Sequence, residues 1–381
     1  METITLTKTE TVTLSIDGKE IKTVKGKRIL EAALDNGIYI PNLCAIPDIK
    51  LPTGACRLCQ VQIEGKRGFI TACSEPAVDG MVVHSNTPEV NDFRREILQI
   101  LLARHPHVCL TCNRRERCKP GDICLRVSSV DEQQCILCPK NGRCELQRAV
   151  DFIGLDDMTY PYQHKGLPIE MDNPFIVRNN NLCILCGRCV RICTELRGNE
   201  AIAFNNRGQE TVISGAFGKP LSESGCKFCA ACVDVCPVGA LSERTSRYAG
   251  LPDRVVSTIC PYCGVGCQLK LEIKDEKIIR VIPDEEGPAN KGQDCVKGKF
   301  GLDFVNHEER LTKPLIKKDG HFVEVEWNEA LDFVASKLSA YKGDQFAAIS
   351  SAKCTNEDNY VFQKFTRGVM GTNSIDHCAR L

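Results

Sequence analysis

The sequence CILCGRCVRIC at residues 183–193 returns as CKFCAACVDVCP at residues 226–237, with all four cysteines at the same spacing. Runs of this kind hold [4Fe-4S] clusters, and the fourth cysteine of each run ligates the cluster of the other run. A zinc ribbon has two Cys-x2-Cys pairs and would leave the remaining cysteines unexplained. The two runs therefore predict a pair of adjacent clusters, with the ligands Cys183, Cys186, Cys189 and Cys236 for one and Cys193, Cys226, Cys229 and Cys232 for the other.

The cysteine content indicates metal ligation along the whole chain. There are 25 cysteines in 381 residues, and the chain is too long to be a small domain held by disulfides. Residues 1–20 contain no basic stretch followed by an apolar run, so no secretory or twin-arginine signal is visible. We therefore expect a cytoplasmic protein, because a reducing compartment keeps thiolates available for iron.

Charge and hydropathy give no indication of nucleic acid or membrane binding. Lys plus Arg and Asp plus Glu both total 49, which gives no reason to expect nucleic acid or an anionic membrane surface as a ligand. The longest apolar stretches, such as residues 97–103, are much shorter than the roughly 18–20 residues that cross a bilayer. We expect no membrane span, and protein partners instead.

The first ninety residues predict a compact domain around four cysteines. Residues 11–16 and 21–24 alternate in hydropathy around an Asp-Gly turn, and a helical pattern begins at Ile29. This order predicts a β-grasp [2Fe-2S] ferredoxin-like domain over residues 1–90. Its ligands are spaced Cys44-x11-Cys56-x2-Cys59-x13-Cys73.

A cysteine motif is duplicated within residues 91–160. The first copy begins at His105, whose neutral imidazole suits borderline iron, and the second copy has Asp131 at the equivalent position. A carboxylate is a poor ligand for a sulfide cluster, so we assign Cys124 as the fourth ligand of the second copy. The predicted [4Fe-4S] ligand sets are His105, Cys109, Cys112 and Cys118 for the first copy, and Cys124, Cys135, Cys138 and Cys144 for the second.

These N-terminal motifs resemble those of complex I G-type subunits and related dehydrogenases, which carry a cluster held by one histidine and three cysteines. In that family Glu-Leu-Gln usually follows the three-cysteine run, and here it follows the second copy, at Glu145. The second copy can therefore occupy the usual position, with His105 and its partners as an insertion. Alternatively, the two copies share ligands around one cluster.

A sixth ligand set starts at Cys260, and residues 268–273 and 277–282 within it are predicted to be short strands. Its sequence context resembles the cluster-bearing domain of bis-pterin molybdenum and tungsten oxidoreductases, here residues 253–312. That resemblance makes Lys297, two residues after the last cysteine, an electron-path residue between cluster and pterin. The [4Fe-4S] ligands are spaced Cys260-x2-Cys263-x3-Cys267-x27-Cys295.

Residues 313–381 predict the start of an α/β domain. A helical pattern starts at Trp327, and a strand spans residues 345–350. Thr355 with Asp358 predicts a capped helix, and the side chains expected to be buried on it are Val361, Phe362, Phe365 and Val369. In α/β domains ligands bind beyond the carboxyl ends of strands, which here is residues 351–354.

The residues Cys354-Thr355-Asn356-Glu357 and residues 371–381 resemble the catalytic subunit of formate dehydrogenase. In that family a cysteine or selenocysteine that binds the metal follows directly. We therefore expect the metal ligand immediately after Leu381, at a UGA codon read as a stop, and no catalytic residue within the chain. Cys354 and Cys378 are expected to be structural thiols.

Together these patterns predict an α+β multidomain protein with a two-[4Fe-4S] ferredoxin domain at residues 175–248 and a truncated molybdopterin oxidoreductase domain at residues 313–381. The resemblance implies reversible oxidation of formate to carbon dioxide at a molybdenum or tungsten bis-pterin guanine dinucleotide, with the chain inactive alone. Electrons would pass to a flavin and iron–sulfur NAD(P)-linked subunit, a ferredoxin or a hydrogenase module. The alternative is a non-catalytic electron-transfer subunit of the complex I G type, or a hydrogenase relay arm.

Overall fold

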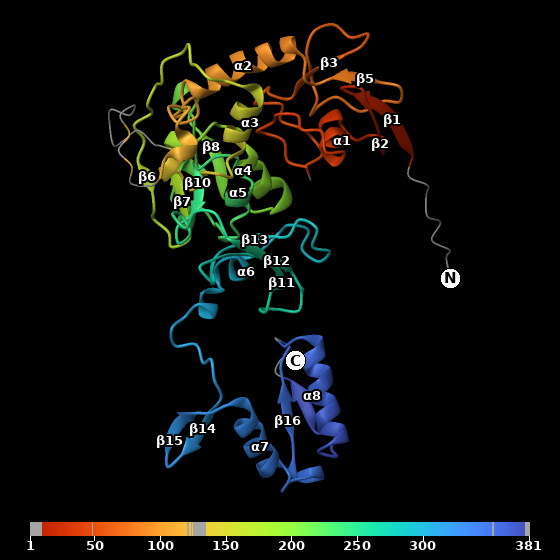
Figure 1. The fold of residues 1–381 in the computed structure, drawn as a ribbon, viewed down its shortest axis with the longest axis vertical. Coiled ribbons are helices and arrows are strands. Elements are labelled where there is room, and N and C mark those ends of the chain that lie inside the picture. Colours follow the sequence, from red (N-terminus) through yellow and green to blue (C-terminus); the bar gives the residue numbers. More distant parts are fainter. Residues whose placement is uncertain are drawn as a thin grey trace. The chain divides into compact units, whose positions relative to one another are not determined.

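The structure is a computed structural model that describes residues 10–47, 49–119, 122, 124, 135–352 and 354–377. The chain divides into two units, residues 1–251 and residues 252–381. Figure 1 shows the order of helices and strands within each unit. No helix among the described residues combines the length and the apolar character needed to cross a membrane.

The first domain is a five-stranded mixed sheet in the order β2-β1-β5-β3-β4. Strands β1 and β2 form the predicted hairpin, with Leu14 opposite Ile21, and β5 runs parallel to β1. The core side chains Ile16 and Ile29 are fully buried between this sheet and α1. The elements are β1 Thr11–Ile16, β2 Lys19–Val24, α1 Ile29–Asp35, β3 Gln60–Ile63, β4 Ile70–Thr71 and β5 Val82–His84.

Two helices follow the sheet. Helix α2, Pro88–Leu102, begins where the Thr87 Oγ1 accepts a hydrogen bond from the Val90 N–H at 3.2 Å. Helix α3, Glu145–Ile153, begins directly after Cys144 and ends at Gly154, whose φ of 71° suits a glycine. Cys144, the last predicted ligand of the duplicated motif, therefore lies at the N-terminus of α3.

The paired cysteine runs adopt the same backbone twice. Leu185 and Phe228, each two residues after the first cysteine of its run, have φ of 54° and 52°. Short helices follow in both runs, α4 Arg188–Arg191 with a π-helical turn Ile192–Leu196, and α5 Ala231–Asp234. The surrounding strands are β6 Ile169–Glu170, β7 Ile176–Asn179 and β10 Leu241–Glu243 in one sheet, and β8 Ile202–Asn205 with β9 Val212–Gly215 in a hairpin.

The second unit opens with a three-stranded antiparallel sheet, β11-β12-β13. Leu269 and Val281 on this sheet form a small core with Cys260 and Leu302. The two predicted strands here are confirmed, and a further strand precedes them. The elements are β11 Arg254–Ile259, β12 Gln268–Lys274, β13 Lys277–Pro283 and α6 Val296–Phe300.

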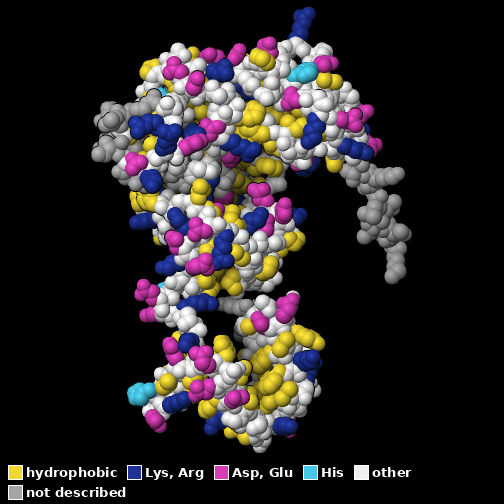
Figure 2. Space-filling view, in the orientation of Figure 1, with side chains coloured by type: hydrophobic (Ala, Val, Ile, Leu, Met, Phe, Trp, Pro, Cys, Tyr) yellow, Lys and Arg dark blue, Asp and Glu magenta, His cyan; other side chains and the backbone are white. Residues whose placement is uncertain are grey.

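The remaining segment has the predicted alternation of strands and helices. Thr355 and Asp358 form the predicted capping box. Phe362 and Phe365 are half-buried, but Val361 and Val369 are exposed, so the burial predicted for these two is wrong. The described residues supply only the two-stranded sheet β16-β17 at this end, which cannot cover a whole helix face; Figure 2 shows apolar side chains at the surface there. The elements are β14 Leu315–Lys318, β15 His321–Glu324, α7 Trp327–Leu338, β16 Ala348–Ser350, α8 Asn356–Gly368 and β17 Ile375–His377.

Candidate iron–sulfur centres

The four cysteines of the first domain come together in two thiol pairs, although they lie far apart in sequence. The Cys56 N–H points at the Cys44 Sγ at 3.4 Å, and a hydrogen bond from the Cys56 thiol lowers the pKa of Cys44 to about 6. Cys59 and Cys73 form the second pair, in which a hydrogen bond from Cys59 lowers the pKa of Cys73. Two pairs of thiolates are what the two irons of a [2Fe-2S] cluster require.

Arg94 on α2 fixes the loop that carries two of these ligands. Its guanidinium is fully buried and donates to the carbonyls of Leu58, at 2.9 Å, and of Gln60, at 2.6 Å. Leu58 lies between Cys56 and Cys59. Burial lowers the pKa of Arg94 to about 10, so the side chain stays positively charged at neutral pH beside an anionic centre.

One of the two predicted ferredoxin ligand sets lines a cavity. The walls contain Cys183, Cys186 and Cys189 from the first run and Cys236 from the second, with apolar side chains such as Ile213 between them. The structure thus brings together the predicted set, including the ligand that crosses from the other run. An apolar wall limits solvent access, which is one of the factors that set a cluster potential.

The other ferredoxin set is also grouped. Burial raises the pKa of Cys232, and the nearby thiols of Cys229, Cys226 and Cys193 raise it further. In both runs the backbone N–H of the residue two positions after the first cysteine points at the sulfur of that cysteine. The Leu185 N lies 3.4 Å from the Cys183 Sγ, and the Phe228 N lies 3.3 Å from the Cys226 Sγ. The positive φ of these two residues is what turns each N–H toward the sulfur.

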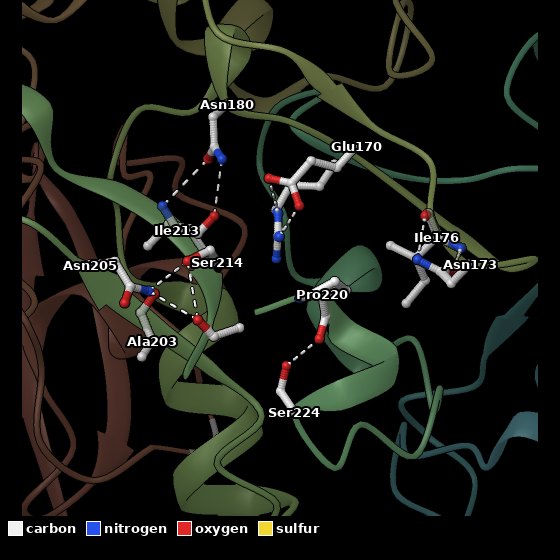
Figure 3. A network of polar contacts seen from close by, with 12 residues as sticks. Glu170, Asn173, Ile176, Asn180, Ala203, Asn205, Ile213, Ser214, Pro220 and Ser224 are labelled. Atoms are coloured by element: carbon white, nitrogen blue, oxygen red, sulfur yellow. Dashed lines mark hydrogen bonds and ion pairs between the residues drawn. The ribbon is translucent and has the colours of Figure 1, made fainter. Parts of the chain in front are cut away.

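A polar network holds the strands around these runs (Figure 3). The Asn180 amide donates to the Ile213 carbonyl at 3.0 Å, and the Asn205 amide donates to the Ser214 Oγ at 2.6 Å. Arg178, buried in β7, makes a two-point ion pair with Glu170. These contacts tie the start of the first run to the β8–β9 hairpin, so the ligand loop is held by residues outside the cysteine motif.

The duplicated motif is grouped differently from the predicted sets. A pocket is lined by His105 together with Cys135, Cys138 and Cys144, so the histidine of the first copy faces the cysteines of the second. Burial lowers the pKa of His105 to about 4, which keeps the imidazole neutral. Burial also raises the pKa of Cys144 to about 12.

The other cysteines of this region lie around that pocket. Cys109 contacts Cys135, whose N–H points at the Cys109 Sγ at 3.3 Å. Cys112, Cys118 and Cys124 are half-buried, and Asp131 lies outside the described residues. The grouping by sequence spacing predicts Cys109, Cys112 and Cys118 beside His105. The structure does not place any of these three cysteines on the pocket wall.

The sixth set lies at one end of the β11–β13 sheet. The Cys260 N–H donates to the Cys267 carbonyl at 2.8 Å. Burial is the main cause that raises the pKa of the Cys260 thiol, and the nearby thiolates of Cys295 and Cys263 raise it further. Cys263 and Cys295 are exposed. Lys297 is exposed on α6, and its role as an electron-path residue remains a prediction.

The donor chemistry of these sites fits iron–sulfur clusters. Within the described ranges no group of three or more histidine, cysteine, aspartate or glutamate side chains is placed to hold a metal ion. Cluster ligands stand farther apart than the ligands of one ion, because sulfides lie between the irons. The backbone at Gly239 also passes close to one of these thiols, because a Cβ on Gly239 would lie 2.4 Å from the Cys138 Sγ.

Arg188, a buried arginine that no motif predicts to be important, connects three of the predicted cluster sites. The Arg188 guanidinium makes a two-point ion pair with Glu145, at 2.6 and 2.9 Å, and also reaches the Val235 carbonyl at 3.3 Å and the Asn42 Oδ1 at 3.4 Å. Each partner lies within two residues of a predicted ligand in a different site. Only the position of Arg188 inside the run CILCGRC could have drawn attention to it.

Four family models match the chain, and together they cover most of it. A 2Fe-2S iron-sulfur cluster binding domain matches residues 9–88, and the ferredoxin-like domain of NADH-quinone oxidoreductase subunit 3 matches residues 173–242. The molybdopterin oxidoreductase Fe4S4 domain matches residues 253–307, and the molybdopterin oxidoreductase model matches residues 310–381. The chain therefore carries 2Fe-2S and 4Fe-4S domains and the start of a molybdopterin oxidoreductase domain.

Curated relatives match the chain along almost its whole length. It is 35% identical to the NADPH-Fe(3+) oxidoreductase alpha subunit of Geobacter sulfurreducens and 35% identical to an NADH-quinone oxidoreductase G subunit of Rhizobium meliloti, each over 97% of this chain and 40% of the relative. A Staphylococcus aureus protein named "Putative formate dehydrogenase" is 32% identical over 97% of this chain and 39% of its own length. The chain spans about two-fifths of the length of these relatives.

Proposed function

We propose that this molybdopterin oxidoreductase with iron–sulfur domains, a homologue of NADH-quinone oxidoreductase G subunits and of proteins named as formate dehydrogenases, forms the electron relay of a formate dehydrogenase. The observation that carries the proposal is the order of the matched domains: the molybdopterin oxidoreductase segment follows directly on a 4Fe-4S domain. Further cluster domains precede both. The name of the staphylococcal relative supports formate as the substrate.

The residues of the chain would hold and tune the clusters. When bound, the clusters supply one-electron transfer, and a bis-pterin molybdenum or tungsten group supplies the two-electron oxidation of formate. The apolar wall around Cys183, the N–H groups aimed at Cys183 and Cys226, and the buried charge of Arg94 set the environment of the sulfurs. Electrons would leave through a redox partner, a flavin and iron–sulfur NAD(P)-linked subunit, a ferredoxin or a hydrogenase module.

A second function is supported equally by the relatives. The Rhizobium meliloti protein is named as a subunit of an NADH-quinone oxidoreductase, and the Geobacter sulfurreducens protein as a subunit of an NADPH-Fe(3+) oxidoreductase. Under that alternative the chain is an electron-transfer subunit without formate chemistry. The electron donor then distinguishes the two functions.

We expect the native enzyme that contains this chain, purified without oxygen, to contain molybdenum or tungsten and to reduce a viologen dye with formate as the donor, whereas this chain alone should not. Formate should also reduce the clusters, which would be seen as the electron paramagnetic resonance (EPR) signals of their reduced forms. The control is NADH or NADPH added without a partner, which should leave the clusters oxidised, because the sequence contains no Gly-x-Gly-x-x-Gly dinucleotide motif. Cluster reduction by NAD(P)H with a partner subunit, but not by formate, would support the alternative instead.

A further inference from the structure

We propose that the duplicated cysteine motif exchanges ligands between its copies, so that His105 completes a cluster site with Cys135, Cys138 and Cys144. The site would hold a [4Fe-4S] cluster with one imidazole and three thiolate ligands. The proposal goes beyond the relay function and depends only on the chain binding clusters, not on formate as a substrate. It also replaces both ligand sets that spacing alone assigns to residues 91–160.

The pocket between the copies is the first observation. Its wall includes His105, the three second-copy cysteines, Gln147 and Gly239. Cys144 begins α3, and its thiol lies 3.6 Å from the Pro237 carbonyl. The pocket is therefore closed by the residues directly after the second ferredoxin run, and it would lie beside the cluster that Cys236 helps to hold.

The imidazole is oriented to ligate. His105 Nδ1 lies 3.0 Å from the Pro106 carbonyl oxygen, which can only accept a hydrogen bond. The neutral ring must therefore carry its proton on Nδ1, which leaves the lone pair on Nε2. Metal-binding histidines are commonly fixed in this way, by a carbonyl that accepts from the other ring nitrogen.

The backbone reserves room beside one of the thiols. A Cβ on Gly239 would lie 2.4 Å from the Cys138 Sγ and 3.3 Å from the Leu182 Cδ1. An unbound cysteine could rotate away from such a methyl group at little cost. A cysteine fixed to an iron could not, so the glycine matters most if Cys138 is a ligand.

The contact between Cys109 and Cys135 argues against placing both thiols on one cluster. The Cys135 N–H points at the Cys109 Sγ at 3.3 Å, and the two thiols share a hydrogen bond. Thiolates on different corners of one [4Fe-4S] cube are held apart by the cube itself, so thiols in contact do not occupy two corners of it. With Cys135 beside His105, the cysteines left for a second site are Cys109, Cys112, Cys118 and Cys124.

The test detects the cluster that has a nitrogen ligand by its EPR signal. In the full-length chain, reduced without oxygen, pulsed EPR should detect ¹⁴N coupling from an imidazole on one cluster. His105→Cys should remove this coupling while keeping the iron content, because a cysteine can replace the ligand. Persistence of the coupling in His105→Cys, or its absence from the parent chain at every potential, would overturn the proposal.

Four further variants decide the grouping. Cys138→Ala and Cys144→Ala should abolish the nitrogen-coupled signal, and Cys112→Ala and Cys118→Ala should keep it. The reverse pattern would restore the grouping by spacing, and loss in all four would indicate one shared cluster; either result overturns the proposal. The [2Fe-2S] signal reports that each variant is folded, and the exposed thiol variant Cys354→Ala is the matched control.

Gly239→Ala supplies an independent test, because it changes no ligand. We expect it to lower the occupancy of the nitrogen-coupled cluster several-fold and to leave the [2Fe-2S] signal unchanged. Gly368→Ala is the control, since a Cβ there meets no atom within 4 Å. Full occupancy of the nitrogen-coupled cluster in Gly239→Ala would count against Cys138 as its ligand.

Discussion

Replacing Cys236 with alanine should disrupt the cluster of the first cysteine run, although Cys236 lies in the second run. The chain should lose roughly one to four irons, because the iron left without its thiolate is labile and its release destabilises the rest of the [4Fe-4S] cluster. The physical reason is the cavity in which Cys236 faces Cys183, Cys186 and Cys189. Cys193→Ala should likewise disrupt the cluster held by the second run.

Double variants make this crossing measurable by iron analysis alone. Cys236→Ala combined with Cys183→Ala should cost at most about four irons, because both changes affect one cluster. Cys236→Ala combined with Cys226→Ala should cost up to about eight irons, because two clusters are affected. The opposite pattern would show that each run keeps its own fourth ligand, and Cys354→Ala should cost none.

Replacing Arg188 with methionine should loosen the junction of three cluster sites at once. Arg188 is 7% exposed, and its removal leaves the Glu145 carboxylate without its charged partner. The Glu145 side chain is 42% exposed, so the cost lies between values for surface and buried ion pairs, at about 2 kcal/mol. In a unit of this size that corresponds to a fall of roughly 4–8 °C in the midpoint of thermal cluster loss.

Three companion variants separate the ion pair from simple packing. Arg188→Lys should recover only part of the loss, because a single ammonium group cannot make the two-point contact. Arg188→Met combined with Glu145→Met should be more stable than Arg188→Met alone, because no half-exposed carboxylate is then left without its charged partner. Lys25→Met, which breaks an exposed ion pair with Glu10, is the control and should shift the midpoint by less than about 2 °C. An Arg188→Met midpoint equal to that of the control would show that the junction is unimportant.

The sequence predicts ligand sets well where the spacing is unique. The two ferredoxin runs and the cysteines from Cys44 to Cys73 come together as their spacing indicates. The duplicated motif is different, because both copies have equal spacing and nothing local tells His105 which three cysteines fold beside it. That choice depends on Gly239 and Pro237, which lie far along the chain and close the pocket.

The same limit applies to the residues that support the ligands. Arg94 and Arg188 act through carbonyls and a carboxylate distant in sequence, and a buried arginine has the same sequence pattern as an exposed one. The helix beginning at Asn356 shows the converse. Its capping box is local and was predicted correctly, whereas the burial of Val361 depends on sheet strands that the described residues do not supply.

Iron and acid-labile sulfide, counted per chain after anaerobic purification, test the assignment of the cysteines most directly. One [2Fe-2S] cluster and five [4Fe-4S] clusters predict about 22 irons and an equal amount of sulfide, with no zinc. A content of about 18 irons would contradict two separate sites in the duplicated motif. Stoichiometric zinc, or iron without matching sulfide, would contradict the iron–sulfur relay itself.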